Sequence, residues 1–143
     1  MTDLVTAFFD DFQRTNAGDD LDAIVSKYAD PFMSADPSGT RVVHVKDFKA
    51  ALPKRKHLFR SIGCKATTLV SLDQTPLDDR YILVRTEWRF ELEPGRPNFT
   101  LPSTFILRKE GDDLGIVFYL THQDIMTVFR ERGLLPTSRE AAQ

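Results

Sequence analysis

Residues 80–93 read RYILVRTEWRFELE and alternate between apolar and charged side chains. An extended chain turns successive side chains to opposite faces, so this stretch divides into two rows. The apolar row carries the only tryptophan of the chain and consists of Ile82, Val84, Thr86, Trp88, Phe90 and Leu92. The charged row consists of Arg85, Glu87, Arg89 and Glu91. The pattern predicts a long strand at the centre of a curved sheet, with helices or a pocket covering the apolar row.

Three further stretches with a period of two lie on either side of this strand. Turn residues separate them, in the sequences TPLDD, PGRP and GDD, which favours an antiparallel meander. The four predicted strands span residues 64–72, 80–93, 98–109 and 114–121. A last helix is predicted over residues 123–132, before Gly133.

The first part of the chain has the spacing of amphipathic helices instead. One helix is predicted over residues 4–18, and a second, shorter one over residues 21–28, before Pro31. Residues 31–39 have the composition of a loop, and residues 40–45 that of a short strand.

A third helix is predicted to begin near Lys46 and Asp47 and to continue to Ile62. Pro53 removes a hydrogen-bond donor in its middle, so we expect this helix to be kinked or split there. The order of elements is helix, helix, strand, helix, four strands and helix. It predicts an α+β fold, with the N-terminal helices in the concave face of a curved antiparallel sheet.

The composition favours one soluble domain. The chain has 143 residues, 41% of them hydrophobic, which suffices for a single core over residues 1–143, with residues 134–143 as a frayed tail. A net charge of -2 gives no overall attraction to nucleic acid or membrane. Cys64 is the only cysteine, which excludes an internal disulfide. The start of the chain is acidic where a signal peptide would be basic, so a cytoplasmic location is the expectation.

Residues 17–39, AGDDLDAIVSKYADPFMSADPSG, carry a resemblance to known proteins. Tyr28-Ala29-Asp30 is followed at a matching distance by Asp36-Pro37-Ser38-Gly39. In this pattern and in its order of elements the chain resembles the nuclear transport factor 2-like superfamily, which includes ketosteroid isomerases, SnoaL-like polyketide cyclases, limonene epoxide hydrolases and scytalone dehydratases. The resemblance implies a cystatin-like cone with an apolar pocket between the sheet and the N-terminal helices.

The resemblance also implies a general base. In the isomerases the aspartate of the second motif moves a proton beside a steroid carbonyl, and by position this role falls to Asp36. These enzymes need a tyrosine and a protonated aspartate for the oxyanion as well, where this chain has Phe12 and Phe105. Neither phenylalanine donates a hydrogen bond, which argues against steroid isomerisation. Asp36 has an alternative interpretation as a turn former before Pro37.

His122 is a second candidate for acid-base chemistry. A period of two places it in the same row as Ile116, Phe118 and Leu120, at the end of the last predicted strand. There it would act as a base or orient a ligand, with Asp124 or Asp36 holding its other nitrogen. The alternative is a core histidine that caps the last helix.

The aromatic side chains are the candidate ligand contacts. Those expected to line the pocket are Tyr28, Phe32, Trp88, Phe90, Phe105 and Phe118. The alternative for them is an ordinary core. The histidines lack the spacing of metal ligands, and no glycine loop suits a phosphate, so neither a metal nor a cofactor is expected.

A basic run at residues 53–57, with Arg60 and Lys65, is the only patch suited to nucleic acid or a phosphate-bearing ligand. Without interleaved aromatic residues, we interpret it as a solvated helix face. The predicted function is binding of a small hydrophobic molecule, with isomerase, cyclase or hydrolase chemistry as an extension. The alternative is a non-catalytic module with a vestigial pocket. A homodimer through the outer sheet face is expected, and neither nucleic acid nor membrane is an expected partner.

Overall fold

The computed structural model describes residues 3–134, and within this range the chain forms four helices and six strands. The helices are α1 (Leu4–Ala17), α2 (Leu21–Val25), α3 (Val45–Ser61) and α4 (Ile125–Glu131). The strands are β1 (Tyr28–Asp36), β2 (Gly39–Val43), β3 (Cys64–Pro76), β4 (Tyr81–Leu92), β5 (Phe99–Glu110) and β6 (Asp113–Thr121). The frayed tail predicted over residues 134–143 lies, apart from Leu134, outside the described residues. No helix in residues 3–134 is long and apolar enough to cross a membrane.

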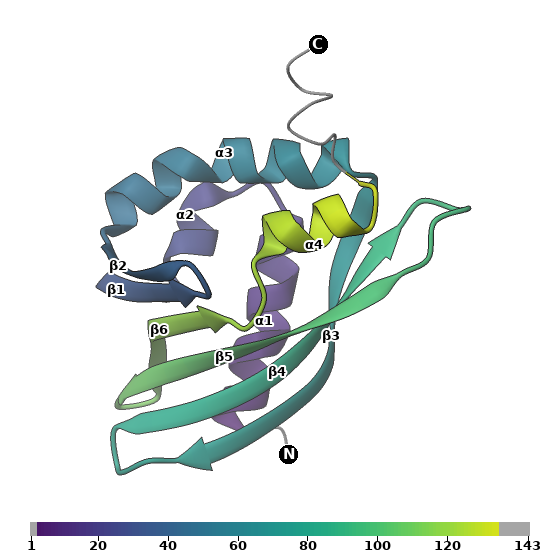
Figure 1. Ribbon diagram of the computed structural model, residues 1–143. Helices are drawn as coiled ribbons and strands as arrows, with labels where there is room; N and C mark the ends of the chain where they lie inside the picture. Colours follow the sequence, from purple (N-terminus) through teal and green to yellow (C-terminus); the bar gives the residue numbers. More distant parts are fainter. Residues whose placement is uncertain (1–2, 135–143) are drawn as a thin grey trace.

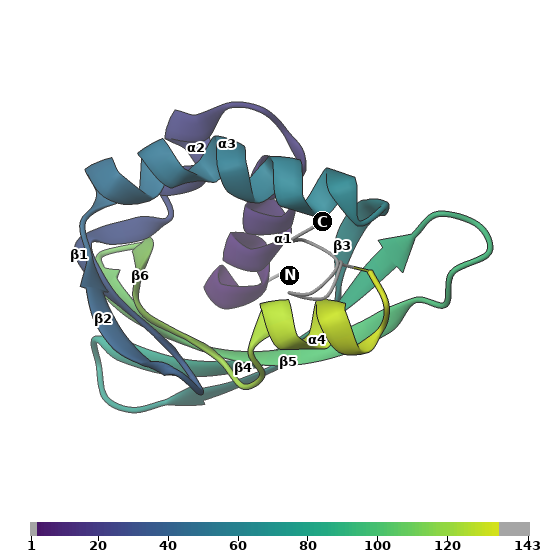
Figure 2. The same cartoon turned by 45° about the horizontal axis from the view of Figure 1, so that its top comes forward.

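All six strands belong to one sheet, in the order β2-β1-β6-β5-β4-β3 (Figure 1). Strands β3 to β6 form the predicted antiparallel meander. Strand β1 lies parallel to β6, so the sheet is mixed where the sequence predicted an antiparallel one. Figure 2 shows the sheet curving around α1, with α3 running along the open side. The predicted α+β class, with helices in the concave face of a curved sheet, is confirmed.

The first strand was not predicted. Tyr28 was expected to end a helix and residues 31–39 to form a loop, but Tyr28–Asp36 is β1, which pairs with β2 on one side and β6 on the other. Its pairing with β6 is irregular between Tyr28 and Met33, which is where the missing donor of Pro31 is tolerated. Pairing with β6, which is far along the sequence, stabilises this strand. The strand propensities of its own residues do not predict such a pairing.

Strand β4 is the predicted long strand, and its two rows separate as expected. Every second residue from Val84 to Leu92 is buried, while Arg85, Glu87 and Arg89 are exposed. The buried row faces the helices, and the charged row forms part of the outer face. A homodimer through that outer face stays a prediction.

Helix α1 covers the inner face of β4 and β5. Asp3 caps it by accepting a hydrogen bond from the backbone amide of Thr6, at 2.8 Å. Helical spacing turns Phe9 and Phe12 toward the sheet. The ring centre of Phe9 lies 5.0 Å from that of Phe105, and the ring centre of Phe12 lies 5.8 Å from that of Trp88. Aromatic packing therefore holds α1 against the sheet.

Helix α3 continues through Pro53, so the predicted split does not occur. Pro53 is exposed, and its ring costs the helix one hydrogen bond. The neighbouring Leu52 is buried in a small second core with Ile24 and Val25 of α2. The packing of Leu52 against α2, directly before Pro53, helps to keep the helix continuous despite the missing bond.

Strand β6 contains a bulge that decides which of its residues face inward. Ile116 pairs with Leu107 of β5, but the next pair is Phe118 with Ile106, so Val117 is an extra residue. Beyond the bulge the alternation of side chains is inverted relative to an uninterrupted strand. Tyr119 and not Phe118 therefore lies opposite Phe105.

Candidate functional site

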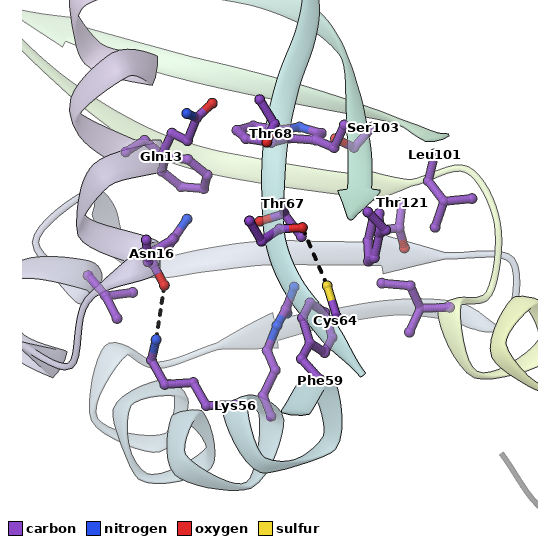
Figure 3. A pocket seen from close by; sticks show the side chains of 18 of the residues that line it. Gln13, Asn16, Lys56, Phe59, Cys64, Thr67, Thr68, Leu101, Ser103 and Thr121 are labelled. Carbon is purple, nitrogen blue, oxygen red and sulfur yellow. Dashed lines mark hydrogen bonds between the residues drawn. The ribbon is translucent and has the colours of Figure 1, made fainter. Parts of the chain in front are cut away.

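A cavity of about 500 Å³ opens between the inner face of the sheet and the helices α1 and α3. Figure 3 shows side chains that line it from several elements: Gln13 and Asn16 of α1, Lys56 of α3, which extends toward Asn16, Thr67 of β3 and Thr121 of β6. The aromatic residues of its wall include Phe12, Tyr28, Trp88, Phe90, Phe105 and Tyr119. An apolar interior with a few polar groups at fixed positions is typical of small-molecule sites.

The floor of the cavity is held by a short chain of hydrogen bonds. The indole nitrogen of Trp88 donates to the hydroxyl oxygen of Thr86, at 2.8 Å. The Thr86 hydroxyl donates to the carbonyl oxygen of Ser103, at 3.0 Å, and lies 2.8 Å from the Ser103 hydroxyl. Thr86 is the one polar residue of the inner row of β4, and these bonds explain its place there. They also fix the plane of the Trp88 ring, which presents its apolar surface to the cavity.

Tyr28 and Tyr119 contribute the phenolic hydroxyls of the cavity wall. Tyr28 begins β1, and the bulge in β6 turns Tyr119 inward, so two neighbouring strands supply the pair. No hydrogen bond from either hydroxyl is present among the described residues, and neither oxygen is sealed from the cavity. Both groups are therefore open to a ligand.

The ionisation of Tyr28 is controlled by its surroundings. Burial raises the pKa of its hydroxyl well above the usual range, the nearby Tyr119 adds to this effect, and the charge of Arg55 opposes it. The side chain is partly buried and keeps some accessible surface because it lines the cavity. Tyr28 consequently stays protonated and is able to donate a hydrogen bond to a ligand oxygen.

The amide of Gln13 is a further polar group above the floor. Its side-chain oxygen accepts a hydrogen bond from the backbone amide of Leu69, at 2.8 Å, which ties α1 to β3. No hydrogen bond of its NH₂ group is present among residues 3–134, and Gln13 belongs to the cavity lining. The amide therefore keeps donors that are not used by its bond to Leu69.

Basic side chains line the cavity where it meets solvent. Arg55, Lys56 and Arg60 project from the same side of α3 as Phe59, and Lys65 follows at the start of β3. Arg55, Arg60 and Lys65 are exposed, as expected for a solvated helix face, but they also belong to the cavity lining, which the sequence interpretation did not include. Lys54 and His57 are exposed and are not part of the lining. Helical periodicity distinguishes the basic residues on the same side as Phe59 from those on the opposite side. The sequence alone does not reveal which of these two sides faces the cavity.

Cys64 also lies in the lining, beside the basic residues. Its thiol donates to the carbonyl oxygen of Ala66, at 3.5 Å (Figure 3). Burial raises the pKa of the thiol, so little of it is a thiolate at neutral pH. This position favours a packing role over that of a nucleophile.

Four of the six predicted ligand contacts line the cavity, namely Tyr28, Trp88, Phe90 and Phe105. Phe32 lies behind the wall, with its ring centre 4.7 Å from that of Tyr28. Phe118 faces the outer side, because the bulge at Val117 inverts the alternation on which its prediction depended. The same bulge brings in Tyr119, which the sequence pattern had assigned to the opposite face.

Asp36 does not reach the cavity. It ends β1, and its carboxylate accepts a hydrogen bond from the backbone amide of Ser38, at 2.8 Å. Hydrogen bonds from the Ser38 hydroxyl and backbone, assisted by the charge of Arg41, lower the pKa of the carboxyl. A general base for proton transfer from carbon would need a raised pKa, so this geometry matches the turn-forming alternative.

His122 is also outside the cavity lining. The inverted alternation beyond Val117 turns it to the outer side, where it is exposed and its Nε2 lies 2.7 Å from the Thr104 hydroxyl. The proposed partner Asp124 instead caps α4 by accepting from the amide of Met126. Asp36 and His122 are therefore not brought together at the cavity. In the described part of the chain, no three of the histidine, cysteine and acidic side chains cluster as metal ligands would.

Comparisons with known proteins agree on the fold. Residues 1–124 match the model of a family described as NTF2-like protein (DUF6841). No curated protein sequence matches the chain. An NTF-2 like protein of unknown function from Shewanella oneidensis MR-1 superimposes with a TM-score of 0.68 and 16% identity, over 84% of this chain and 97% of that one.

Two other solved structures have the same architecture. A protein of unknown function with a cystatin-like fold from Nostoc punctiforme PCC 73102 has a TM-score of 0.65 and 6% identity, over 85% of this chain and 89% of its own. A third structure is that of a hypothetical protein from Catenulispora acidiphila DSM 44928, with a ketosteroid isomerase-like fold and in complex with trimethylamine. It has a TM-score of 0.56 and 13% identity, over 90% of this chain and 93% of its own. At these identities the likeness extends to the fold alone.

Proposed function

The chain belongs to the NTF2-like family (DUF6841), and from that premise we propose that it binds a small molecule with a hydrophobic, aromatic-sized body in the cavity between the sheet and α1 and α3. The observation that carries this proposal is the cavity itself. Its volume of about 500 Å³ falls within the roughly 300–1,000 Å³ of small-molecule sites. Protein interiors are ordinarily close-packed, so a space of this size supports a binding role.

The chemistry of the wall indicates how a ligand is held. The rings of Trp88 and Phe105 offer apolar surface, and the open hydroxyls of Tyr28 and Tyr119 offer hydrogen bonds. A flat ligand with one or two oxygen atoms would contact the apolar rings and also accept hydrogen bonds from the tyrosine hydroxyls. Asp36 and His122 lie outside the lining, and the hydroxyls and amides of the wall do not form an acid-base pair, so binding is favoured over isomerase, cyclase or hydrolase chemistry.

A cavity-filling substitution tests the proposal. Thr67 points into the cavity from β3 (Figure 3), so Thr67→Phe should occupy part of it. Thr100 of β5 is exposed and lies outside the lining, so Thr100→Phe is the matched control. The wild-type protein and both variants are screened by thermal shift against neutral steroids, polyketides and terpenoids, since a ligand of the native state raises the melting temperature.

We expect ligands that stabilise the wild-type protein and Thr100→Phe by several degrees and that leave Thr67→Phe unchanged. The single tryptophan gives a second readout, because a ligand on the cavity floor contacts Trp88 and alters its fluorescence. Equal stabilisation of all three proteins would place binding elsewhere and refute the proposal.

A further inference from the structure

The mouth of the cavity carries an excess of positive charge. Five basic side chains contribute to the lining, and the one carboxylate among the lining residues is that of Asp19. The basic residues are Arg14, Arg55, Lys56, Arg60 and Lys65. The chain as a whole has a net charge of -2, so this concentration of cations is local.

Most of these cations are not neutralised by the protein. Arg14 forms an ion pair with Asp11, at 2.7 Å, which neutralises its charge. Among residues 3–134, no carboxylate lies within 4.0 Å of the charged groups of Arg55, Lys56, Arg60 or Lys65, as every ion pair of the described part of the chain involves other residues.

Two of the unneutralised cations are held in place without a negative partner. The guanidinium of Arg55 lies over the ring of Phe59, 5.4 Å from its centre. The ammonium group of Lys56 donates to the backbone carbonyl of Asn16, at 2.9 Å, which joins α3 to α1 across the mouth (Figure 3). Both side chains therefore keep donors available beside the apolar interior.

The positions of the charges separate the cavity into two parts. Arg55, Arg60 and Lys65 are exposed although they belong to the lining, so they lie where the cavity opens to solvent. Trp88 and Phe105 are buried and form the inner end. A bound molecule that fills the cavity thus has an apolar end at the floor and another end among cations.

We infer that the ligand is an organic acid, with an apolar, ring-containing body on the floor and a carboxylate or similar anionic group at the mouth between Arg55, Lys56, Arg60 and Lys65. This inference rests on the proposed function and narrows its substrate class. A guanidinium binds a carboxylate through two parallel hydrogen bonds, which gives the mouth geometric as well as electrostatic preference. Nucleic acid is disfavoured, because these cations belong to the lining of a cavity and are not interleaved with exposed aromatic residues.

A pair of compounds that differ in one group isolates the charge. The probes are 1-pyrenebutyrate and its primary amide, which share the same apolar body, and binding is followed by pyrene fluorescence anisotropy. Arg55→Gln/Arg60→Gln removes two charges from the mouth. Lys46→Gln/Lys54→Gln removes two charges from exposed positions of the same helix outside the lining, so it is the matched control. Circular dichroism checks that each variant is folded.

We expect the acid to bind wild-type protein and the control variant about tenfold to a hundredfold more tightly than the amide, the range given by hydrogen bonds to charged groups. In Arg55→Gln/Arg60→Gln this preference should shrink to about twofold, with binding of the amide nearly unchanged. Binding of the acid should also be lost in Thr67→Phe.

The possible results separate the two proposals. Equal binding of acid and amide to wild-type protein would overturn the inference and leave the proposed function standing. A preference for the acid that is unchanged in Arg55→Gln/Arg60→Gln would overturn the assignment of the mouth. Failure of both compounds, and of 2-naphthoate with 2-naphthamide, at millimolar concentration would overturn the proposed function and the inference with it.

Discussion

Replacing Thr86 with valine tests whether the floor of the cavity depends on a buried hydroxyl. Valine has the same branched shape as threonine and suits a strand equally well, so packing is nearly unchanged. Thr86 is only 3% exposed, and its hydroxyl accepts from the Trp88 indole and bonds to Ser103. The substitution therefore removes hydrogen bonds and little else.

The expected loss of stability follows from the groups left without partners. A buried N–H such as that of Trp88 costs about 1–3 kcal/mol when its acceptor is removed, and the lost bond to Ser103 costs about 1 kcal/mol. Burying a methyl group in place of the hydroxyl offsets this by about 0.8 kcal/mol. We expect Thr86→Val to lower the free energy of unfolding by about 2 kcal/mol, which corresponds to a melting temperature roughly 5–10 °C lower.

Urea denaturation followed by the fluorescence of the single tryptophan measures this change, because Trp88 is itself the affected partner. The control is Thr67→Val, since the Thr67 hydroxyl has no hydrogen bond among residues 3–134; its effect should stay within about 0.5 kcal/mol. In a Trp88→Phe background, followed by circular dichroism, the cost of Thr86→Val should fall by about 1–3 kcal/mol. A cost equal to that of Thr67→Val, or one unaffected by Trp88→Phe, would refute the reasoning.

Two further predictions concern a thiol and a carboxylate. Because burial raises the pKa of Cys64, alkylation by iodoacetamide at pH 7 should be slower than that of a free cysteine and should accelerate toward pH 9; a cavity ligand should slow it further, and a rate insensitive to ligand would contradict its place in the lining. Hydrogen bonds from the backbone amides of Arg80 and Tyr81 lower the pKa of Asp78 in the folded state below its value in the unfolded chain. The folded state then binds fewer protons, so this stabilisation is present above about pH 4 and is lost as the pH falls through the folded pKa. Denaturation of Asp78→Ala should differ from wild type at pH 7 and converge with it near pH 2, and a constant difference would count against the linkage.

The parts of the fold that were predicted depend on contacts that repeat along the chain. In β4 every second residue from Val84 to Leu92 is buried and the residues between them are exposed or half-buried, so the alternation is visible in the sequence alone. The packing of Phe9 and Phe12 follows from helical spacing in the same way. The sequences of β4 and α1 therefore suffice to predict which of their residues are buried.

The parts that were missed depend on partners distant in sequence. Strand β1 gains its pairing from β6, and its residues Pro31 to Asp36 have little intrinsic preference for a strand. The bulge at Val117 leaves no compositional mark, yet it decided the outcome for both Phe118 and His122. The place of Arg55 in the cavity lining could be predicted only by knowing which side of α3 faces the sheet.

The unpaired Val117 also governs how site residues are transferred between relatives by alignment. A relative whose last strand lacks the extra residue is one position shorter there, and the gap has to be placed opposite Val117 for its cavity residues to align with Tyr119 and Thr121. If the gap is placed beyond the bulge, inward residues of one protein are equated with outward residues of the other. At the low identities of these structural neighbours, an alignment error of one position at this strand would replace Tyr119 and Thr121 in the inferred wall by Phe118 and Leu120, or by Leu120 and His122.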